Sequence, residues 1–364
     1  MRFFTKIFYA PDGGGALVNA TGNYVNAYTG ATTAFSGADT LTSTMKTYYD
    51  TELLENARPN FVHAQFARKQ ALPKGRGKKV EWRKWNTLAD ASALQEGVIP
   101  TGQKLGQSSM TSAILQYGTY VTVSDQLKLH AIDDVILGAT EELGASAGTT
   151  QDKLVRDVLA AGTNVQYADK IGANDAHTAV TTRAGMDKTS RLTPTEVNKA
   201  VTTLKKQHVP TINGKYVAII NPSVSYDLRQ SKEWIEAHKY AAVTELFNGE
   251  IGELHGVRFI ETTEAKIWNN STCPVKTAAV SGGAAATYYS VYSTLFLGKD
   301  AFGMIDPEGG SLEMIIKSER ESGGPLNQFS TLGYKFSTAT KILYQERMLR
   351  VESLSEYSDV DAAN

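Results

Sequence analysis

The stretch AIDDVILGATEELGASAGTTQDKLVRDVLA, residues 131–160, carries the longest periodic pattern in the sequence. Its apolar side chains recur at spacings near three to four residues, at Ile132, Ile136, Ala139, Leu143, Ala147, Leu154 and Val158. This spacing is typical of one face of an amphipathic helix, which at 1.5 Å per residue would be about 40 Å long. Gly144 and Gly148 each destabilise a helix by about 1 kcal/mol relative to alanine, so we expect a kink or break near them.

Residues 68–124, just before this helix, have the pattern of a long β-hairpin. Gly77 indicates a turn, and Val80 and Trp82 indicate a strand that follows it. A second β-prone run covers 111–124, and the glycines and proline between the two runs predict a wide hairpin tip. Because a two-stranded hairpin is only marginally stable in water, we expect this one to lie on another surface.

Charge is segregated between this hairpin and the helix. Residues 68–85 contain eight basic residues and one acidic residue, whereas residues 125–157 contain seven acidic and three basic residues. Opposite charges on separate surfaces favour complementary contact between copies of one chain. We therefore expect contacts to another subunit at Lys78, Lys79, Arg83 and Lys84. Two alternatives remain open, a solvated hairpin base and contact with nucleic acid.

The sequence after the helix predicts a small α/β or α+β domain. Thr193, Pro194 and Glu196 form a capping box that begins a helix. A buried strand is expected over 216–220, and a second helix over 223–230. Further strands are expected over 256–261, 284–297 and 312–317. The β-prone segments 333–344 and 348–353 are expected to return to an earlier sheet.

The N-terminal segment has a different composition. Residues 11–44 are dominated by Gly, Ala, Thr, Asn and Ser and carry almost no charge. Such a segment buries too little apolar surface to offset its backbone entropy, so we expect a flexible arm that anchors on its own domain or on a neighbour. Short helices are predicted over 44–55 and 60–66.

Composition excludes several classes of protein. The 364 residues include 37 Lys plus Arg and 38 Asp plus Glu, for a formal net charge of −1. That balance argues against a protein whose main task is binding nucleic acid or an anionic membrane. The apolar runs are shorter than the roughly 20 residues of a membrane helix. We expect no signal peptide and folding in a reducing cytoplasm, where the single Cys273 is a small, semi-buried apolar residue.

No catalytic, cofactor-binding or metal-binding motif is complete in the sequence. Residues 75–79 (GRGKK) lack the leading Gly of a phosphate loop and the Ser or Thr after its lysine. Ser281 lacks the first glycine of a nucleophile elbow. None of the six histidines stands at metal-ligand spacing from a second His or Cys. We therefore expect no catalysis, no cofactor and no metal, and an active site assembled from distant residues remains an open alternative.

Several stretches, taken in order, resemble the major capsid proteins of tailed bacteriophages, in the branch typified by coliphage N-four. They are MKTYYD at 45–50, PNFVHAQF at 59–66, residues 116–124, VRDVLAAGTNV at 155–165, GKDAFG at 298–303 and PLNQFSTLGY at 325–334. They cover most of the chain from about residue 44 to 353. The first 43 residues match nothing comparable.

This resemblance implies an α+β protein with the major-capsid fold that tailed phages share with herpesviruses. The implied parts are an N-terminal arm (1–67), an extended β-hairpin loop (68–124), a peripheral domain with a long spine helix (125–192), an axial α/β domain (193–300) and a return to the peripheral domain with a C-terminal tail (301–364). The hairpin would lie across an adjacent subunit, and the axial domain would meet its copies around five-fold and quasi-six-fold axes.

The implied function is that of a non-catalytic subunit which self-assembles into an icosahedral virion shell around double-stranded DNA. The implied partners are copies of the chain in hexamers and pentamers, together with scaffold, portal and decoration proteins. No membrane is involved, and assembly is expected in the cytoplasm of the host bacterium. Two alternatives remain open: the shell of a bacterial encapsulating nanocompartment that holds protein cargo, and an enzyme with a cryptic site.

Overall fold

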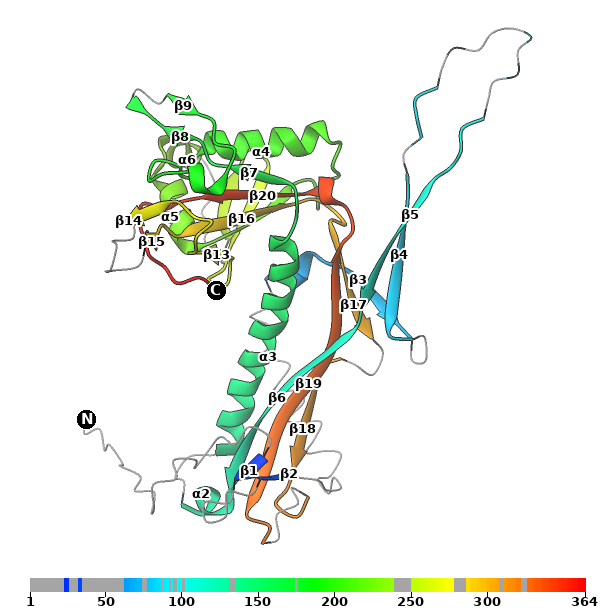
Figure 1. Ribbon diagram of the computed structural model, residues 1–364, viewed down its shortest axis with the longest axis vertical. Helices are drawn as coiled ribbons and strands as arrows, with labels where there is room; N and C mark the ends of the chain where they lie inside the picture. The colour runs from blue at the N-terminus through cyan, green and yellow to red at the C-terminus, as the bar shows by residue number, and fades with distance from the viewer. Residues whose placement is uncertain are drawn as a thin grey trace. The chain divides into compact units, whose positions relative to one another are not determined.

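The computed structural model in Figure 1 describes residues 23–25, 32–34 and 62–364, with gaps at 74–76, 87, 92, 94–96, 98, 100–101, 131–134, 174–175, 239–249, 278–285, 308–310 and 322–325. The chain forms two compact units. We name them the spine unit (residues 1–62, 116–153 and 307–338) and the sheet unit (residues 63–115, 154–306 and 339–364).

The spine unit is built around a long helix and a long strand. Its elements are the strand pair β1 (Asn23–Val25) and β2 (Thr32–Ala34), then β6 (Leu115–Ser124), α2 (Asp125–His130), α3 (Val135–Ala160), β18 (Glu313–Lys317) and β19 (Phe329–Ile342). Strands β18 and β6 both pair with β19, and α3 and β19 each continue into the sheet unit. The expected α+β character and long helix are therefore confirmed.

Helix α3 is continuous through Gly144 and Gly148, so the expected break is absent. Both glycines are buried, together with Leu143 and Ala147 on the same stretch. The Ser146 hydroxyl oxygen of α3 lies 3.2 Å from the Tyr334 hydroxyl oxygen of β19. Packing and hydrogen bonding therefore outweigh the low helix propensity of the glycines.

The sheet unit contains a seven-stranded sheet in the order β11-β12-β10-β16-β20-β7, with β13 also paired to β16. These strands are β7 (Val165–Tyr167), β10 (Tyr216–Ile220), β11 (Glu250–Leu254), β12 (Val257–Glu261), β13 (Ile267–Trp268), β16 (Val291–Leu297) and β20 (Met348–Ser353). Its helices are α4 (Pro194–Lys206), α5 (Pro222–Gln230) and α6 (Lys232–His238). Two small strand pairs accompany them, β8 (Lys170–Ile171) with β9 (His177–Thr178), and β14 (Val275–Thr277) with β15 (Thr287–Tyr288).

The two central strands of this sheet are buried along their whole length. Every residue of β10 and of β16 is buried, which a strand covered on both faces requires. Phe259 and Phe296 pack edge to face with ring centroids 6.4 Å apart in the main hydrophobic core. Both helices that follow in the chain have capped starts: the Thr193 side chain accepts a hydrogen bond from the Glu196 amide, as the sequence predicted, and the Asn221 side chain accepts one from the Ser223 amide.

The C-terminal strand differs from the expected division of the chain, which placed residues 301–364 in one part with the spine helix. Strand β20 instead lies inside the seven-stranded sheet, antiparallel to β16 and parallel to β7. All six of its residues are buried, so it needs partners on both edges and both faces. The tail that follows remains on the sheet unit, where the Tyr292 hydroxyl donates to Asp361 over 2.6 Å.

The hairpin is shorter than the expected span of 68–124. Strands β4 (Lys79–Trp85) and β5 (Gln107–Ala113) pair from Lys79 with Ala113 to Trp85 with Gln107. The flanking strand β3 (Arg68–Leu72) pairs with β17 (Phe302–Pro307), and β6 pairs with β19. Strands β3 and β6 thus pair with other parts of the chain, and only β4 and β5 form the hairpin.

The structure tests only a few of the expectations for residues 1–67. A 3-10 helix at His63–Phe66 lies where the short helix over 60–66 was predicted. The antiparallel pair β1–β2 lies inside the expected arm. The predicted helix over 44–55 lies outside the described residues. Among the described helices, none has both the length and the apolar character for crossing a membrane.

Candidate assembly interface

The base of the hairpin is anchored by alternate side chains of β4. Val80 and Trp82 are 6% and 8% exposed and pack in one cluster with Ile305, Ala339 and Leu343. These partners lie on β17, at the end of β19 and just beyond it, all within the sheet unit. The period-2 alternation of β4 therefore fixes which face of the hairpin meets its own chain.

Beyond this base the hairpin exposes large apolar side chains. Trp85, Leu88 and Leu105 are 60%, 51% and 54% exposed, and Ile99 is 93% exposed. Figure 1 shows β4 and β5 continuing side by side beyond their contact with β17. Fully burying one such side chain is worth about 1.5–3 kcal/mol, so exposed residues gathered on one projecting element indicate a surface that a partner covers.

The four basic residues expected to contact another subunit differ in whether they have an acidic partner in their own chain. Lys84 lies 3.4 Å from a Glu346 carboxylate oxygen and 4.6 Å from the centroid of the Tyr344 ring. Arg83 pairs with Glu81 at 3.2 Å. Lys78 and Lys79 are exposed, and no ion pair joins either of them to another residue in the described ranges.

Fewer acidic side chains of α3 are available for contact with another copy than the sequence suggests. Asp152 is buried, and Asp157 lies 2.9 Å from Arg156 and 3.3 Å from Lys266. Glu141 and Glu142 remain exposed. The segregation of charge read from the sequence is therefore partly used inside the subunit, and Lys78, Lys79, Glu141 and Glu142 are among its exposed members.

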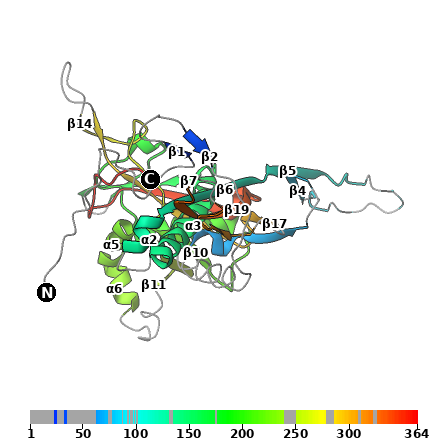
Figure 2. The ribbon, with the colours of Figure 1, turned by 90° about the horizontal axis from the view of Figure 1, so that it is seen from below.

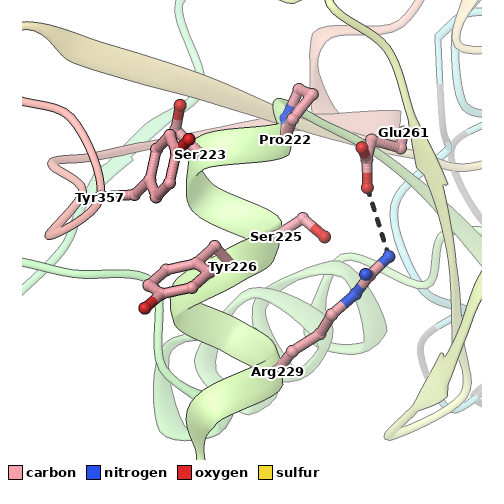
Figure 3. A pocket seen from close by; sticks show the side chains of 7 residues that line it. All are labelled: Pro222, Ser223, Ser225, Tyr226, Arg229, Glu261 and Tyr357. Carbon is pink, nitrogen blue, oxygen red and sulfur yellow. Dashed lines mark hydrogen bonds and ion pairs between the residues drawn. The ribbon is translucent and has the colours of Figure 1, made fainter.

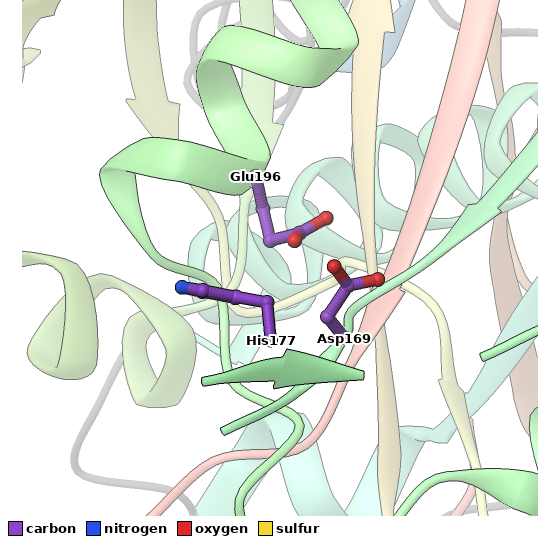
Figure 4. Close-up of side chains that lie close together, drawn as sticks. All are labelled: Asp169, His177 and Glu196. Atoms are coloured by element: carbon purple, nitrogen blue, oxygen red, sulfur yellow. The ribbon is translucent and has the colours of Figure 1, made fainter. Parts of the chain in front are cut away.

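A polar cluster that the sequence did not reveal joins α4 to the chain before it. Figure 4 shows Asp169, His177 and Glu196 close together, with potential metal-ligand atoms within 4.8 Å of one another. The Lys199 ammonium, however, donates to Asp169 and, over 2.9 Å, to Glu196. The Gln166 amide donates to the second Glu196 oxygen over 2.8 Å.

This cluster is satisfied by the chain itself. Burial disfavours the charged form of Lys199, but the hydrogen bonds to Asp169 and Glu196 outweigh that effect and raise its pKa. The carboxylates thus have a cation already, so the cluster is best explained as an ion-pair network that holds α4. The spacing of Glu196 and Lys199, three residues apart on a helix, was the only sequence signal for it.

A second buried charge network holds β20. Glu352 is fully buried and accepts from Arg183 over 2.6 and 2.7 Å and from Arg350 over 2.9 Å. The Arg183 guanidinium lies 4.0 Å from the centroid of the Trp268 ring. Removing one partner of such a buried pair leaves an uncompensated charge, so this network ties the C-terminal strand firmly to the sheet unit.

Comparisons with known proteins identify the family of proteins to which these features correspond. A family model described as phage capsid protein matches residues 107–339. Among solved structures, the capsid of Ralstonia phage GP4 matches with a TM-score of 0.61 at 14% identity, over 82% of this chain and 89% of that chain. The cyanophage Pam1 capsid matches with a TM-score of 0.57 at 12% identity, over 91% of this chain and 98% of that one. No curated protein sequence matches.

Proposed function

The chain belongs to the phage capsid protein family, and we propose that it builds the icosahedral shell of a tailed phage around a double-stranded DNA genome. As a family member it is a shell-forming structural subunit of the virion and not an enzyme. Its fold is that of tailed-phage capsid proteins, as the similarity to the GP4 and Pam1 capsids shows.

The observation that carries the proposed mode of assembly is the apolar surface of the hairpin. Trp85, Leu88 and Leu105 are more than half exposed on an element whose base is packed and whose outer part is not. In our proposal this outer part lies across an adjacent copy, which removes these side chains from water. Repeating one such contact throughout a closed, symmetric shell makes a stable particle from individually modest interfaces.

Lys78 and Lys79 are the proposed charged contacts at the base of this surface. Exposed pairs contribute about 1 kcal/mol or less each, so we assign them a role in orientation and association rate rather than in strength. Arg83 and Lys84 also remain candidates for contact with another subunit. Because each already has an acidic neighbour in its own chain, we expect a smaller contribution from them.

The finer assignments follow from the stretches that resemble the N-four branch. We propose that the chain belongs to that branch, that it forms hexamers and pentamers, and that scaffold, portal and decoration proteins are its partners during assembly in the host cytoplasm. The proposed peripheral domain contains α3, and the proposed axial domain contains residues 193–300. On the strand pairing above, we add β7 and β20 to the axial domain.

Electron microscopy of native particles, combined with analysis of their nucleic acid, tests this function. We expect closed icosahedral shells that contain double-stranded DNA. Shells filled with protein and lacking a genome would instead indicate an encapsulating nanocompartment. A chain that stays a monodisperse monomer at high concentration, under conditions that assemble related capsids, would refute the shell-forming contact through the hairpin.

A further inference from the structure

The inward face of β4 ends in a charged residue. Val80, Trp82 and Lys84 alternate along the strand and therefore lie on one face of it. The first two are buried in the base of the hairpin, whereas Lys84 is only partly buried. Figure 2 shows β4 and β5 extending side by side away from β17. Lys84 thus lies where the packed base of the hairpin gives way to its projecting part.

Lys84 contacts the short turn between β19 and β20. Its ammonium group lies 3.4 Å from a Glu346 carboxylate oxygen and 4.6 Å from the centroid of the Tyr344 ring. The Arg347 guanidinium lies 3.9 Å from the same centroid. The face of an aromatic ring attracts cations, so Tyr344 binds one cation from the hairpin and one from the turn itself.

This turn is fixed to the sheet unit by its own hydrogen bonds. The Tyr344 amide donates to the Ala301 carbonyl oxygen over 3.1 Å, and the Arg347 guanidinium donates to the Lys299 carbonyl oxygen, also over 3.1 Å. The turn therefore provides a fixed platform, and the projecting hairpin is the less supported side of the contact.

We propose that the contact of Lys84 with Tyr344 and Glu346 is a latch that sets the direction in which the hairpin projects. Lys84 is then a positioning residue: it holds the inward face of β4 on its own chain and leaves Trp85, on the opposite face, for a neighbouring copy. The inference rests on the proposed function, because the direction of the hairpin matters only if the hairpin lies on another copy.

Such a latch would assist assembly without adding a contact between copies. An element already held in its bound orientation loses less conformational freedom on association. Exposed ion pairs and cation–π contacts are individually weak, so the latch can also open when the hairpin must adapt to a neighbour.

The distance between two spin labels in dilute, unassembled subunits tests the latch, measured by double electron–electron resonance. One label is attached at Lys104→Cys, an exposed position in the outer hairpin, and the other at Gln230→Cys, an exposed position at the end of α5. The native Cys273 is 1% exposed and so should not be labelled.

Helix α5 is a suitable reference because side chains on both of its sides are held. Figure 3 shows Arg229 directed at Glu261, an ion pair of 3.4 Å, and Tyr226 near Tyr357 on another side of the helix. The two tyrosine ring centroids are 5.2 Å apart. A change in the width of the distance distribution therefore reports the hairpin and not the reference.

Lys84→Glu should make the distance distribution about twice as wide, because it places a second carboxylate beside Glu346. Exchanging the charges, Lys84→Glu with Glu346→Lys, should restore the narrow distribution and the assembly rate. Arg83→Glu is the matched control: Arg83 lies on the opposite face of β4 and pairs with Glu81 of the same strand at 3.2 Å, so the width should not change.

Equal widths for the native chain and Lys84→Glu would overturn the latch, and shells that still form would leave the shell-forming function intact. A charge exchange that leaves the distribution broad would also overturn it, because Lys84 would then act on a group other than Glu346. If circular dichroism shows that Lys84→Glu does not fold, Lys84→Met replaces it, since it keeps an apolar stem and removes the charge. We expect a smaller broadening from this variant, and an unchanged width would contradict the proposal.

Discussion

The seven-stranded sheet and the β4–β5 hairpin belong to the same unit, yet they differ in how far they bury their apolar side chains. Strand β16 buries all seven of its residues, whereas β4 buries Val80 and Trp82 and then leaves Trp85 60% exposed. The sheet therefore completes its packing inside the chain, and the hairpin does not. Changes in the two regions should accordingly be measured by different quantities, the stability of the subunit and the assembly of the shell.

The largest effect is expected in the sheet. Phe296→Ala removes a fully buried ring that packs against Phe259, and such truncations cost about 3–5 kcal/mol. Denaturant unfolding of unassembled subunits, followed by circular dichroism, measures the loss. Phe296→Leu is the matched control and should lose less. An effect of Phe296→Ala within the error of the measurement would show that this sheet is not the core.

The hairpin should give the opposite result. The double change of Trp85→Ser and Leu105→Ser should weaken assembly by about 2–3 kcal/mol per contact, because two half-exposed side chains no longer become buried between copies. The stability of the isolated subunit should change by no more than about 0.5 kcal/mol. Light scattering and electron microscopy report assembly.

Trp82→Ala is the control within the same strand. Trp82 is 8% exposed and packs on the hairpin base, so this variant should destabilise the subunit itself. If the Trp85 and Leu105 changes destabilise the subunit as much as Trp82→Ala does and leave the assembly of folded subunits unchanged, the contrast drawn between sheet and hairpin is wrong.

A glycine substitution tests whether the spine unit behaves like the sheet. A Cβ at Gly118 would lie 2.5 Å from the Tyr334 carbonyl oxygen, so Gly118→Ala must push β6 away from β19. We expect a loss of about 1–3 kcal/mol in subunit stability, as for other overpacked sites. Gly138→Ala on α3 is the control, because a Cβ there meets nothing within 4 Å. Equal unfolding midpoints for the two variants would exclude tight pairing of β6 with β19.

Charge reversal tests how much the basic residues of the hairpin contribute to assembly. Lys78→Glu with Lys79→Glu should slow assembly most at low salt and less at high salt, since screening weakens exposed charge interactions. Each charge is expected to contribute about 1 kcal/mol or less. The pair Arg83→Glu with Lys84→Glu should have a smaller effect on assembly, because both residues have acidic neighbours in their own chain. Assembly rates that do not depend on salt would remove these residues from the contact.

The smallest effect concerns pH in the spine unit. Lys128 donates to Glu319 over 2.7 Å and lowers the pKa of that carboxyl group. A carboxyl group with a lowered pKa in the folded state stabilises it at neutral pH, and this contribution is lost as the pH falls through the lowered pKa. Glu319→Gln should therefore lower the melting temperature slightly at pH 7 and no longer do so in strong acid. A difference that grows on acidification would contradict this sign.

The elements with strong local patterns could be predicted from sequence. The 3.6-residue period predicted α3, the alternation around Val80 and Trp82 predicted β4, and Thr193 predicted the start of α4. Each of these signals lies within a few residues of the element it specifies. The resemblance of quoted stretches to tailed-phage capsid proteins supplied the fold and the function, which the family match then supported.

The sequence alone determined that this chain has a long helix, an under-packed hairpin and a compact α/β part. Only the tertiary structure decided that β20 joins β7 and β16, that Lys84 is paired with Glu346, and that Lys199 sits between two carboxylates. The reason is physical: helices and strand faces follow from the spacing of neighbouring residues, whereas strand partners and ion pairs join residues far apart in the chain. Those pairings depend on which buried groups remain to be satisfied once the core has formed.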